Sequence, residues 1–458
     1  MPNFKKLAKP YYENALKALQ ELVRCPSVYD PTTIEANAPY GRGVKKALDY
    51  VAKLGKDYGF RVDTCDGHCT ELAFGQGDGP DIGIYAHSDV VPVSGSWRKP
   101  PFSGAIEGEG KEAKLISRGS SDDKGPLIAA LFACKLLKDN NLVQGYKIRF
   151  VTGGDEERGS SCLDYYFHTL KKPATDYGFT PDADFPLIYA EKGIVHGTLS
   201  KTIDLKPVIA MDGGTVPNAV CDKLVITLPA DKKFAQYLKD KNVPSEVNNA
   251  GEIDIVTFKG KTAHGSRPDL GINAALIGFK ALAEFYKIAA LDKLVGLLSD
   301  PTGKAFGGDG SSKELGANTW NFGVVKYGSD QKLSITVDFR FGEGIEPHEL
   351  MSRLEKATEM SLSKRTEAPV LLYDKKSPLV STLMKSYKRM THKFFDKPMA
   401  IGGGTYAKEA KNCVAYGSAF KNHPGDIHSP NEYIYLDDFY AQIAIYADAI
   451  YSLGQLKK

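Results

Sequence analysis

Short apolar runs alternate with amphipathic stretches between residue 81 and about residue 190, and this alternation restricts the fold more than any other feature of the chain. The segments DIGIYAH (81–87) and KIRFVTG (147–153) have the composition of buried strands, whereas PLIAALFACKLLKD (126–139) carries apolar residues at helical spacing. Alternation of this kind is typical of a sheet with helices on its faces. The sequence therefore predicts an α/β fold with a mixed, mostly parallel sheet for this part of the chain.

The middle of the chain has a different pattern. KLVITL (223–228), DIVTF (254–258) and KLSITVDFRFG (332–342) alternate apolar and polar residues, as half-buried strands do. In the last of these, Asp338 and Arg340 fall on the polar face. A helical run at 273–291 lies among the strands, so an antiparallel sheet covered by helices is expected here.

The two patterns predict two domains. An α+β domain of residues 192–379 is expected as an insertion, which leaves residues 1–191 and 380–458 as one discontinuous domain. Helices are expected at both ends of the chain, and the last, at 437–456, begins with two Asp residues that suit a helix N-terminus.

Composition excludes several classes of partner. Lys plus Arg is 59 and Asp plus Glu is 56, so the net charge of +3 indicates neither nucleic-acid nor membrane binding. No 18-residue apolar run and no signal-peptide core is present. The seven Cys form no C-x-x-C pair, which favours a reducing compartment. We expect a cytoplasmic protein with no membrane or nucleic-acid partner.

Acidic residues and histidines stand where the predicted strands end. His87 and Asp89 follow the first apolar strand; an imidazole suits zinc, and a carboxylate two residues on can orient its ring. Taken alone, this segment is more often a surface turn. Asp122 and Asp123 open the next helix, where two acids also make an ordinary helix start.

Three consecutive acids at the end of the strand 147–152 are more specific. Asp155, Glu156 and Glu157 repel one another unless a cation is present, and one Glu could bind metal while its neighbour acts as a base. The strings TPDAD (180–184), GKTAHGSRP (260–268) and NHPGDIHSPNE (422–432) supply further candidates. Each histidine alone is more often structural, but their joint placement at strand ends indicates a metal site.

Two rival motifs can be set aside. Ser121 and Lys124 spell the S-x-x-K of penicillin-recognising enzymes, but neither S-D-N nor K-T-G occurs. The run Gly402-Gly403-Gly404 resembles a phosphate loop, but no G-x-x-x-x-G-K-[ST] is present.

The strings AHSDVVP, SRGSSDDKGP, GGDEERG, FTPDADFPLIYAEKG, GGGTYAK and GDIHSPNEYI occur in one characteristic order. With them, nearly the whole chain resembles the co-catalytic zinc metallopeptidases, the family of carboxypeptidase G, succinyl-diaminopimelate desuccinylase, aminoacylase and carnosinase, and most of all its peptidase V dipeptidases. The resemblance implies a di-zinc catalytic domain with an inserted lid domain.

The resemblance also implies a set of metal ligands. In the family, the His of H-x-D, the first Asp of D-D-K-G, the second Glu of E-E, a later Asp and a C-terminal His hold two Zn²⁺ ions, which Co²⁺ or Mn²⁺ can replace. The matching positions in this chain are His87, Asp122, Glu157, Asp182 and His428. Asp184 and His423 compete for the last two places; the T-P-D-A string favours Asp182, and the S-P-N-E-Y string favours His428.

Three catalytic roles follow from the same resemblance. Asp89 orients His87, and Glu156 is the general base that takes a proton from a metal-activated water and passes it to the leaving amine. His264, from the inserted domain, stabilises the oxyanion.

Substrate recognition is assigned in the same way. Arg340 matches the family arginine that grips a terminal carboxylate, Asn218 is a companion contact, and the loop of Gly403 and Thr405 offers backbone N–H groups. The resemblance implies a dipeptidase acting on small peptides with a free C-terminal carboxylate. Its large insertion resembles that of peptidase V, which implies a monomer. The alternatives are an N-acyl amino acid amidohydrolase (deacylase or desuccinylase) and, outside enzymes, a peptide-binding protein with a decayed site.

Overall fold

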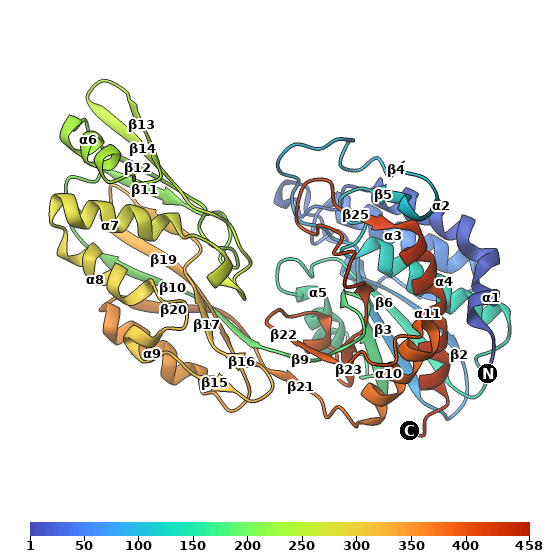
Figure 1. Ribbon diagram of the computed structural model, residues 1–458. Coiled ribbons are helices and arrows are strands. Elements are labelled where there is room, and N and C mark those ends of the chain that lie inside the picture. The colour runs from blue at the N-terminus through green and yellow to red at the C-terminus, as the bar shows by residue number, and fades with distance from the viewer. The chain divides into compact units, whose positions relative to one another are not determined.

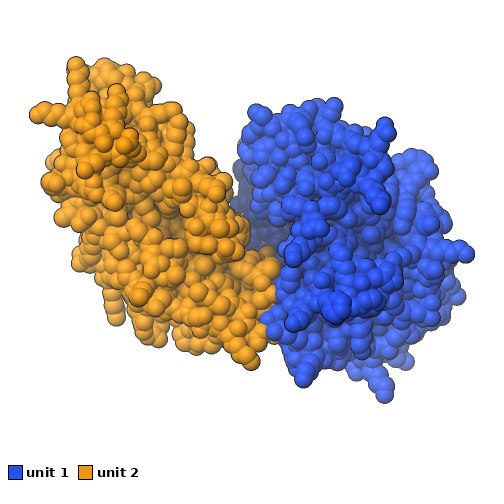
Figure 2. Space-filling model, viewed as in Figure 1, with its two compact units in different colours: residues 1–189, 373–399, 405–458 blue, residues 190–372, 400–404 orange.

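The computed structural model describes residues 1–458, which form two compact units (Figure 2). Unit 1 comprises residues 1–189, 373–399 and 405–458, and unit 2 comprises residues 190–372 and 400–404. Unit 2 is therefore an insertion into the chain of unit 1, with one short additional segment.

Unit 1 is built on a mixed sheet. Its principal strands are β1 (Arg61–Asp63), β2 (Cys69–Gly75), β3 (Asp81–His87), β6 (Lys147–Gly153), β7 (Tyr177–Thr180), β9 (Ile188–Glu191) and β23 (Cys413–Ala415). They lie in the order β1-β2-β6-β3-β7-β23-β9. The central strands β6, β3, β7 and β23 are parallel, whereas β2 and β9 pair antiparallel with their neighbours. The carboxyl ends of three neighbouring parallel strands, β6, β3 and β7, thus meet at one edge of the sheet.

Helices cover this sheet (Figure 1). The main ones are α2 (Tyr12–Val23), α3 (Arg42–Asp57), α4 (Lys124–Asp139), α10 (Pro378–Thr391) and α11 (Leu436–Gly454). Helices α4 and α11 pack against each other and against β3, and α3 packs against β2. Helix α4 is buried on nearly every side, which explains why its sequence is apolar throughout rather than along one stripe.

A small separate sheet in unit 1 was not anticipated from the sequence. Its strands are β4 (Ala105–Glu107), β5 (Lys114–Ile116) and β25 (Tyr433–Tyr435), in the order β25-β5-β4. Each strand has only three residues, which is too short for an alternating apolar and polar pattern to be recognised in the sequence. The pairing of β25 with β5 brings the loop before residue 433 next to the loop that follows residue 116.

Unit 2 contains an antiparallel sheet with helices on one face (Figure 1). Its strands are β10 (Gly193–Thr202), β11 (Ala210–Gly213), β12 (Lys223–Pro229), β13 (Ser245–Asn249), β14 (Ile253–Lys259), β17 (Thr319–Asn321), β18 (Val325–Tyr327), β19 (Lys332–Phe341) and β20 (Ser361–Ala368). Its helices are α6 (Lys232–Asp240), α7 (Ala274–Tyr286), α8 (Ala289–Leu298) and α9 (Pro347–Thr358). Apolar residues of the sheet and the helices form one core. The predicted fold class, a mixed α/β part plus an antiparallel α+β part, is confirmed.

Three local predictions need correction. The helical run 273–291 is two helices, because Lys287 adopts a left-handed conformation with φ 61° between α7 and α8. Asp437 and Asp438 do not cap α11; they lie in its first turn, where their charge favours the helix dipole. In β19, the last polar positions, Asp338 and Arg340, are buried rather than solvated.

None of the helices is both long and apolar enough to cross a bilayer. All seven cysteines are buried and unpaired, and Cys134 is buried within α4.

Candidate metal centre

The candidate site lies where the three parallel strands end. His87 is the last residue of β3 and pairs in register with Gly153, the last residue of β6. The acids Glu156 and Glu157 follow β6, and Asp182 follows β7. Open sheets of this kind bind ligands at the carboxyl ends of their strands.

One group of donors consists of His87, Asp122 and Asp182, whose ligand atoms all lie within 4.8 Å of one another. The Nε2 atom of His87 is 3.0 Å from Asp122 Oδ1 and 3.7 Å from Asp182 Oδ2. Its ring is fully buried. An imidazole and two carboxylates around one point are a donor set that suits a divalent transition metal.

A second group consists of Asp122, Glu157 and His428, again within 4.8 Å. The Nε2 atom of His428 is 2.9 Å from Asp122 Oδ2 and 3.2 Å from Glu157 Oε2. Asp122 belongs to both groups and faces a different imidazole with each carboxylate oxygen. The arrangement therefore offers two adjacent cation positions that share one carboxylate.

Asp89 holds parts of both groups in place. The Nδ1 atom of His87 is 3.1 Å from the Asp89 carbonyl oxygen and 3.4 Å from its Oδ1 atom, which leaves Nε2 directed at Asp122. The two carboxylate oxygens of Asp89 also accept hydrogen bonds from the backbone N–H groups of Glu156 and Glu157, each over 3.1 Å. Asp89 thus fixes the ring of one candidate ligand and the turn that carries another.

Asp123 shows why the ordinary helix-start interpretation of this segment is wrong. It occupies the N-cap position of α4, but its side chain caps no helical N–H group. Its Oδ2 atom instead accepts a hydrogen bond from the backbone N–H of His87 over 3.1 Å. The two adjacent acids therefore serve the strand ends and not the helix.

Glu432 is a positioning residue that the sequence did not single out. Its Oε1 atom accepts hydrogen bonds from the backbone N–H groups of Ser121 and Asp122, over 2.9 and 3.1 Å. Its Oε2 atom is 2.7 Å from Nη1 of Arg118, and both side chains are 1% exposed. The signal was an acid in the string that follows His428, but its partner lies far away in the sequence.

Tyr406 supports the same region from within the core. Its ring packs edge-on against the ring of His87, with centroids 6.1 Å apart. A Cβ atom at Gly153 would lie 2.0 Å from the Tyr406 hydroxyl oxygen, so only glycine fits there. The glycine at the end of β6 therefore allows the close packing that holds His87.

The electrostatics of the cluster call for a cation. Burial raises the pKa of Asp182 to about 7, with the charge of Asp122 adding to the shift. Burial also raises the pKa values of Glu156 and Asp123 well above their usual range. Burial opposes the charged form of His87, but hydrogen bonds with Asp122 and Asp89 outweigh it and raise the His87 pKa well above its usual range.

The basic side chains of unit 1 do not neutralise these acids. Within 4.0 Å, the candidate carboxylates meet only the imidazoles of His87 and His428 among the basic groups of unit 1. Lys124 is buried nearby, but its ammonium donates to the carbonyl oxygen of Cys25 over 2.7 Å. The Oε1 atom of Glu157 is buried without a hydrogen-bond partner. Divalent cations would satisfy both the charge and the unpartnered oxygen.

The two competing candidates lie outside the donor groups. Asp184 is in β8 (Ala183–Asp184), which pairs with β24 (Ser418–Ala419). The Nδ1 atom of His423 is 2.5 Å from Asp438 Oδ2. The structure therefore brings Asp182 and His428 to the cluster rather than these neighbours.

In unit 2, Arg340 is buried beside Asp338. Its Nε atom donates to Asp338 Oδ1 and its Nη2 atom to Asp338 Oδ2, each over 3.1 Å. Its Nη1 atom donates to the carbonyl oxygen of Gly402 over 2.7 Å. A guanidinium has five N–H groups, so one on each terminal nitrogen is still available to a ligand.

Asn218 and His264 lie on neighbouring loops of unit 2. The backbone N–H of Gly265 donates to the carbonyl oxygen of Asn218 over 2.7 Å. A Cβ atom at Gly265 would lie 2.2 Å from Asp338 Oδ2, so this loop also adjoins the Arg340 ion pair. His264 is exposed, and its Nδ1 atom is 2.7 Å from the hydroxyl of Ser266.

Lys192 is a further cation of this region that the sequence did not single out. Burial lowers its pKa to about 8, and the positive charges of Arg340 and Arg267 lower it further. The backbone N–H of Lys192 donates to the carbonyl oxygen of Ile401, next to the Gly402 carbonyl that Arg340 contacts. Cations gathered in this way favour an anionic ligand.

The loop predicted to contact substrate, with Gly403 and Thr405, belongs partly to unit 2 and partly to unit 1. Gly403 belongs to unit 2, where a Cβ atom would contact only Ile401 at 3.6 Å, so its backbone is open to approach. Thr405 belongs to unit 1, is buried, and accepts a hydrogen bond from the backbone N–H of Ala407 over 3.2 Å.

Known proteins share this sequence pattern. The sequence profile of Peptidase family M20/M25/M40 matches residues 83–452. "Putative dipeptidase YtjP" of Bacillus subtilis (strain 168) is 32% identical over 468 aligned residues, which cover 97% of this chain and 98% of that protein. "Putative dipeptidase SAB1611c" of Staphylococcus aureus (strain bovine RF122 / ET3-1) is 31% identical over 474 aligned residues, which cover 98% of this chain and 99% of that protein.

Solved structures share the fold at low sequence identity. Human carnosine dipeptidase 1 has a TM-score of 0.61 at 13% identity, with 100% of both chains covered. The di-peptidase Dug1p from Saccharomyces cerevisiae has a TM-score of 0.62 at 12% identity, with 99% of this chain and 98% of that chain covered. Bacillus subtilis YXEP, described as a dinuclear metal binding peptidase from the M20 family, has a TM-score of 0.51 at 10% identity, with 97% and 98% covered.

Proposed function

The chain belongs to peptidase family M20/M25/M40 and is a metallopeptidase, and we propose that it is a dipeptidase acting on short peptides with a free C-terminal carboxylate. One observation carries the proposal: two donor groups share Asp122, which faces His87 with one oxygen and His428 with the other. In this proposal unit 1 is the catalytic domain and unit 2 is the inserted lid domain.

We assign two Zn²⁺ ions to the cluster, with Co²⁺ or Mn²⁺ as substitutes. His87, Asp122 and Asp182 would hold one ion, and Asp122, Glu157 and His428 the other. The imidazole and carboxylate donors suit zinc, and the unpartnered Oε1 atom of Glu157 fits a ligand role. The side chain of His428 is 43% exposed, so one side of the cluster is open to substrate.

When bound, the ions would polarise the scissile carbonyl and make a water molecule acidic enough to lose a proton near neutral pH. Glu156 is the proposed general base. Its backbone is held by Asp89, and its carboxylate makes no ion pair within unit 1. Burial raises its pKa, so the group can accept a proton and later release it to the leaving amine.

Unit 2 supplies substrate recognition in this proposal. The two remaining N–H groups of Arg340 suit the two oxygens of a terminal carboxylate, and Lys192 adds positive charge beside them. Asn218 and the open backbone at Gly403 are further contacts, and His264 is the proposed oxyanion donor. These assignments favour substrates whose C-terminal carboxylate is free.

A substrate panel tests the proposal against its nearest rival, an N-acyl amino acid amidohydrolase. Dipeptides should be compared with N-acetyl and N-succinyl amino acids that carry the same C-terminal residue. We expect kcat/KM on dipeptides to be higher by on the order of tenfold or more. Faster turnover of the acylated compounds would instead identify an amidohydrolase.

A C-terminal amide of the best dipeptide is the matched control for carboxylate recognition. Loss of the charged hydrogen bonds to Arg340 should lower kcat/KM by about tenfold to a hundredfold. Equal turnover of the acid and the amide would remove the carboxylate from the proposal.

We also propose a monomer that works in the cytoplasm. The seven buried, unpaired cysteines fit a reducing compartment. Sedimentation velocity at micromolar concentration measures the oligomeric state directly, and a dimer mass would contradict this part of the proposal.

A further inference from the structure

Two adjacent phenylalanines are exposed in the turn between α10 and β22 (Met399–Ile401). Phe394 is 60% exposed and Phe395 is 96% exposed, the highest value among the large apolar side chains of the protein. A single exposed apolar residue is ordinary, but two aromatic rings at one turn place a large apolar surface in water. Such a feature calls for an apolar partner.

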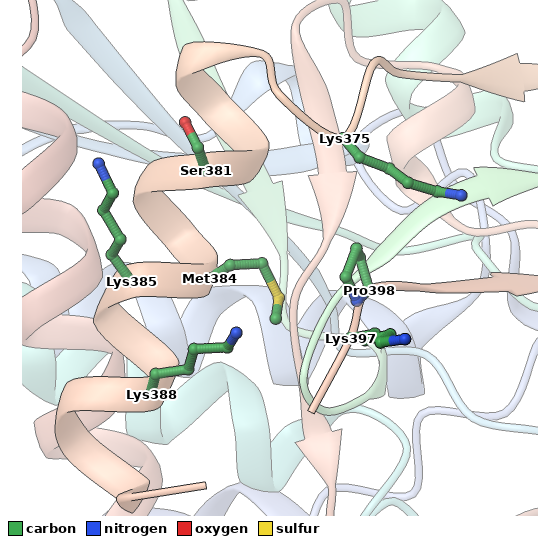
Figure 3. Close-up of a pocket in the computed structure, with 7 residues that line it drawn as sticks. All are labelled: Lys375, Ser381, Met384, Lys385, Lys388, Lys397 and Pro398. Atoms are coloured by element: carbon green, nitrogen blue, oxygen red, sulfur yellow. The ribbon is translucent and has the colours of Figure 1, made fainter. Parts of the chain in front are cut away.

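A basic hollow adjoins this turn at Lys397 and Pro398, and Figure 3 shows the residues that line it. Its volume is about 360 Å³, and its lining residues are Lys375, Ser381, Met384, Lys385, Lys388, Lys397 and Pro398. Lys385 and Lys388 project from α10, while Met384 points across to Pro398 and forms the apolar part of the lining (Figure 3). Four of the lining residues are cations and none is an acid, so the hollow favours an anion.

Further cations lie near the start of the turn, around Lys393. A second hollow of about 530 Å³ is lined in part by Lys5, Lys9 and Lys393. The Nζ atom of Lys5 is 3.4 Å from Nε2 of His392, which places the N-terminal lysines beside the turn. Asp437 and Asp438 also line this hollow, so it is mixed in charge, unlike the first.

The acid within the turn, Asp396, forms no ion pair within 4.0 Å with these lysines. It accepts a hydrogen bond from the hydroxyl of Tyr387 over 2.7 Å. Lys385 and Lys388 are one helical turn apart, so their like charges repel in the absence of an anion. Arg389, by contrast, is bound to the buried Asp448 and is not part of the patch.

We propose that the Phe394–Phe395 turn and its surrounding lysines form a docking surface for a membrane that contains anionic phospholipids. The phenylalanine rings enter the boundary between headgroups and acyl chains, and the lysine ammonium groups contact lipid phosphates. A free phosphate would account for the lysines alone; the exposed rings require an apolar phase beside the anions. The contact is peripheral and needs no spanning helix.

This inference departs from the expectation that the protein has no membrane partner. That expectation rested on the net charge of +3 and on the absence of long apolar runs. Neither quantity detects a few lysines and two rings that the fold gathers on one surface of unit 1. The inference is independent of the proposed peptidase activity.

Vesicle co-sedimentation of the full chain tests it. Vesicles of phosphatidylcholine alone are compared with vesicles in which about a third of the lipid is phosphatidylglycerol. We expect binding to the anionic vesicles that is at least roughly tenfold tighter and that weakens as salt is raised. No binding, or equal binding to both vesicles, would overturn the proposal.

Paired variants locate the surface. Phe394→Ser with Phe395→Ser, and separately Lys388→Glu with Lys397→Glu, should each reduce binding about tenfold or more. The matched controls are Ile209→Ser with Val247→Ser, at exposed apolar positions of unit 2, and Lys232→Glu with Lys233→Glu, at exposed lysines there. Thermal unfolding of each variant checks that it is folded. Equal losses in the controls would overturn the assigned location.

Two further measurements separate lipid from other anions. The conservative Phe395→Trp variant should keep vesicle binding, and its added tryptophan emission should shift to shorter wavelength on anionic vesicles. Calorimetric titration with inorganic pyrophosphate should show no binding that competes with vesicles. Tight pyrophosphate binding without vesicle binding would identify a soluble polyanion site and contradict the docking surface.

Discussion

Arg340 and Asp338 form a forked ion pair two residues apart on β19, with Nε···Oδ1 and Nη2···Oδ2 distances of 3.1 Å. Both side chains are buried, at 3% and 0% exposed. The carboxylate fixes the plane of the guanidinium, and the Gly402 carbonyl fixes its third nitrogen. Arg340 is therefore held in one orientation before any ligand arrives, which reduces the entropy cost of binding.

The first prediction concerns Arg340→Lys. A lysine keeps the charge but cannot contact Asp338 and a substrate carboxylate with fixed, parallel donors. KM for a dipeptide should rise about tenfold to a hundredfold, with a smaller change in kcat. Steady-state kinetics measures both values. Arg353→Lys, at an exposed arginine of the same unit that pairs with Glu349, is the control, and an effect no larger than this control would mean that Arg340 is only structural.

The second prediction concerns the acid stability of unit 2. Burial disfavours the charged form of Asp338, but the charges of Arg340 and His196 outweigh this and lower its pKa to about 2. A carboxyl group with a depressed folded pKa stabilises the fold above its unfolded pKa of ~3.9 and loses this contribution as the pH falls toward 2. Between pH 5 and 3 the loss is about 1 kcal/mol, and Asp338→Asn should lack it. Urea unfolding at both pH values measures the difference; identical pH slopes for the two proteins would contradict it.

The third prediction concerns Lys192 at alkaline pH. Because burial lowers its pKa to about 8, the side chain is charged at pH 7 and mostly neutral at pH 9.5. The affinity for a carboxylate substrate should fall over this interval, so KM should rise by up to about tenfold. Lys192→Arg keeps its charge and should show a flatter KM profile. Superimposable profiles of the two proteins would exclude Lys192 from substrate binding.

The fourth prediction concerns metal content. Asp182→Asn removes a donor of the His87 group, whereas Asp184→Asn alters an acid in β8 outside both groups. We expect elemental analysis to find two ions per chain in the parent and in Asp184→Asn, and fewer in Asp182→Asn. Chelation should abolish activity and lower the unfolding temperature, because the buried carboxylates then lose their counter-charge. Reversed metal contents of the two variants would assign the ligand to Asp184.

The sequence predicted the fold class because its strong signals are local. Buried parallel strands such as β3 and β6 read as apolar runs, and acids or histidines directly after them share one sheet edge once the strands are parallel. For this reason the acids and histidines that follow the predicted strands could be expected at one edge, but the choice of His87, Glu157 and Asp182 among them came from the resemblance to a family. Asp122 and His428 lie on loops, and the same resemblance connected them with the strand ends.

Other features depend on contacts that a single sequence does not reveal. Glu432 acts through the backbone of Asp122, more than three hundred residues earlier, and reaches it because three-residue strands pair there. Lys192 lies near Arg340 because it directly precedes β10, and in the pairing of β10 with β19 Ile194 is opposite Arg340. The break between α7 and α8 occurs at Lys287, which adopts a left-handed backbone conformation. Helices often end at a glycine in this conformation, but here the residue is a lysine, so the sequence does not indicate the break.

The last prediction separates the two adjacent glutamates of the candidate centre. Their backbone N–H groups bind the two oxygens of Asp89, so the side chains leave the same turn with different neighbours. Glu157 faces His428, whereas Glu156 has a raised pKa from burial and belongs to neither donor group. Glu156→Gln should therefore keep two ions per chain but lower kcat by roughly a thousandfold, because an amide cannot accept the proton of the attacking water. Glu157→Gln should lose metal as well as activity, and Glu109→Gln, at an exposed acid, should change neither. Loss of metal in Glu156→Gln would make it a ligand, and unchanged turnover would require another base.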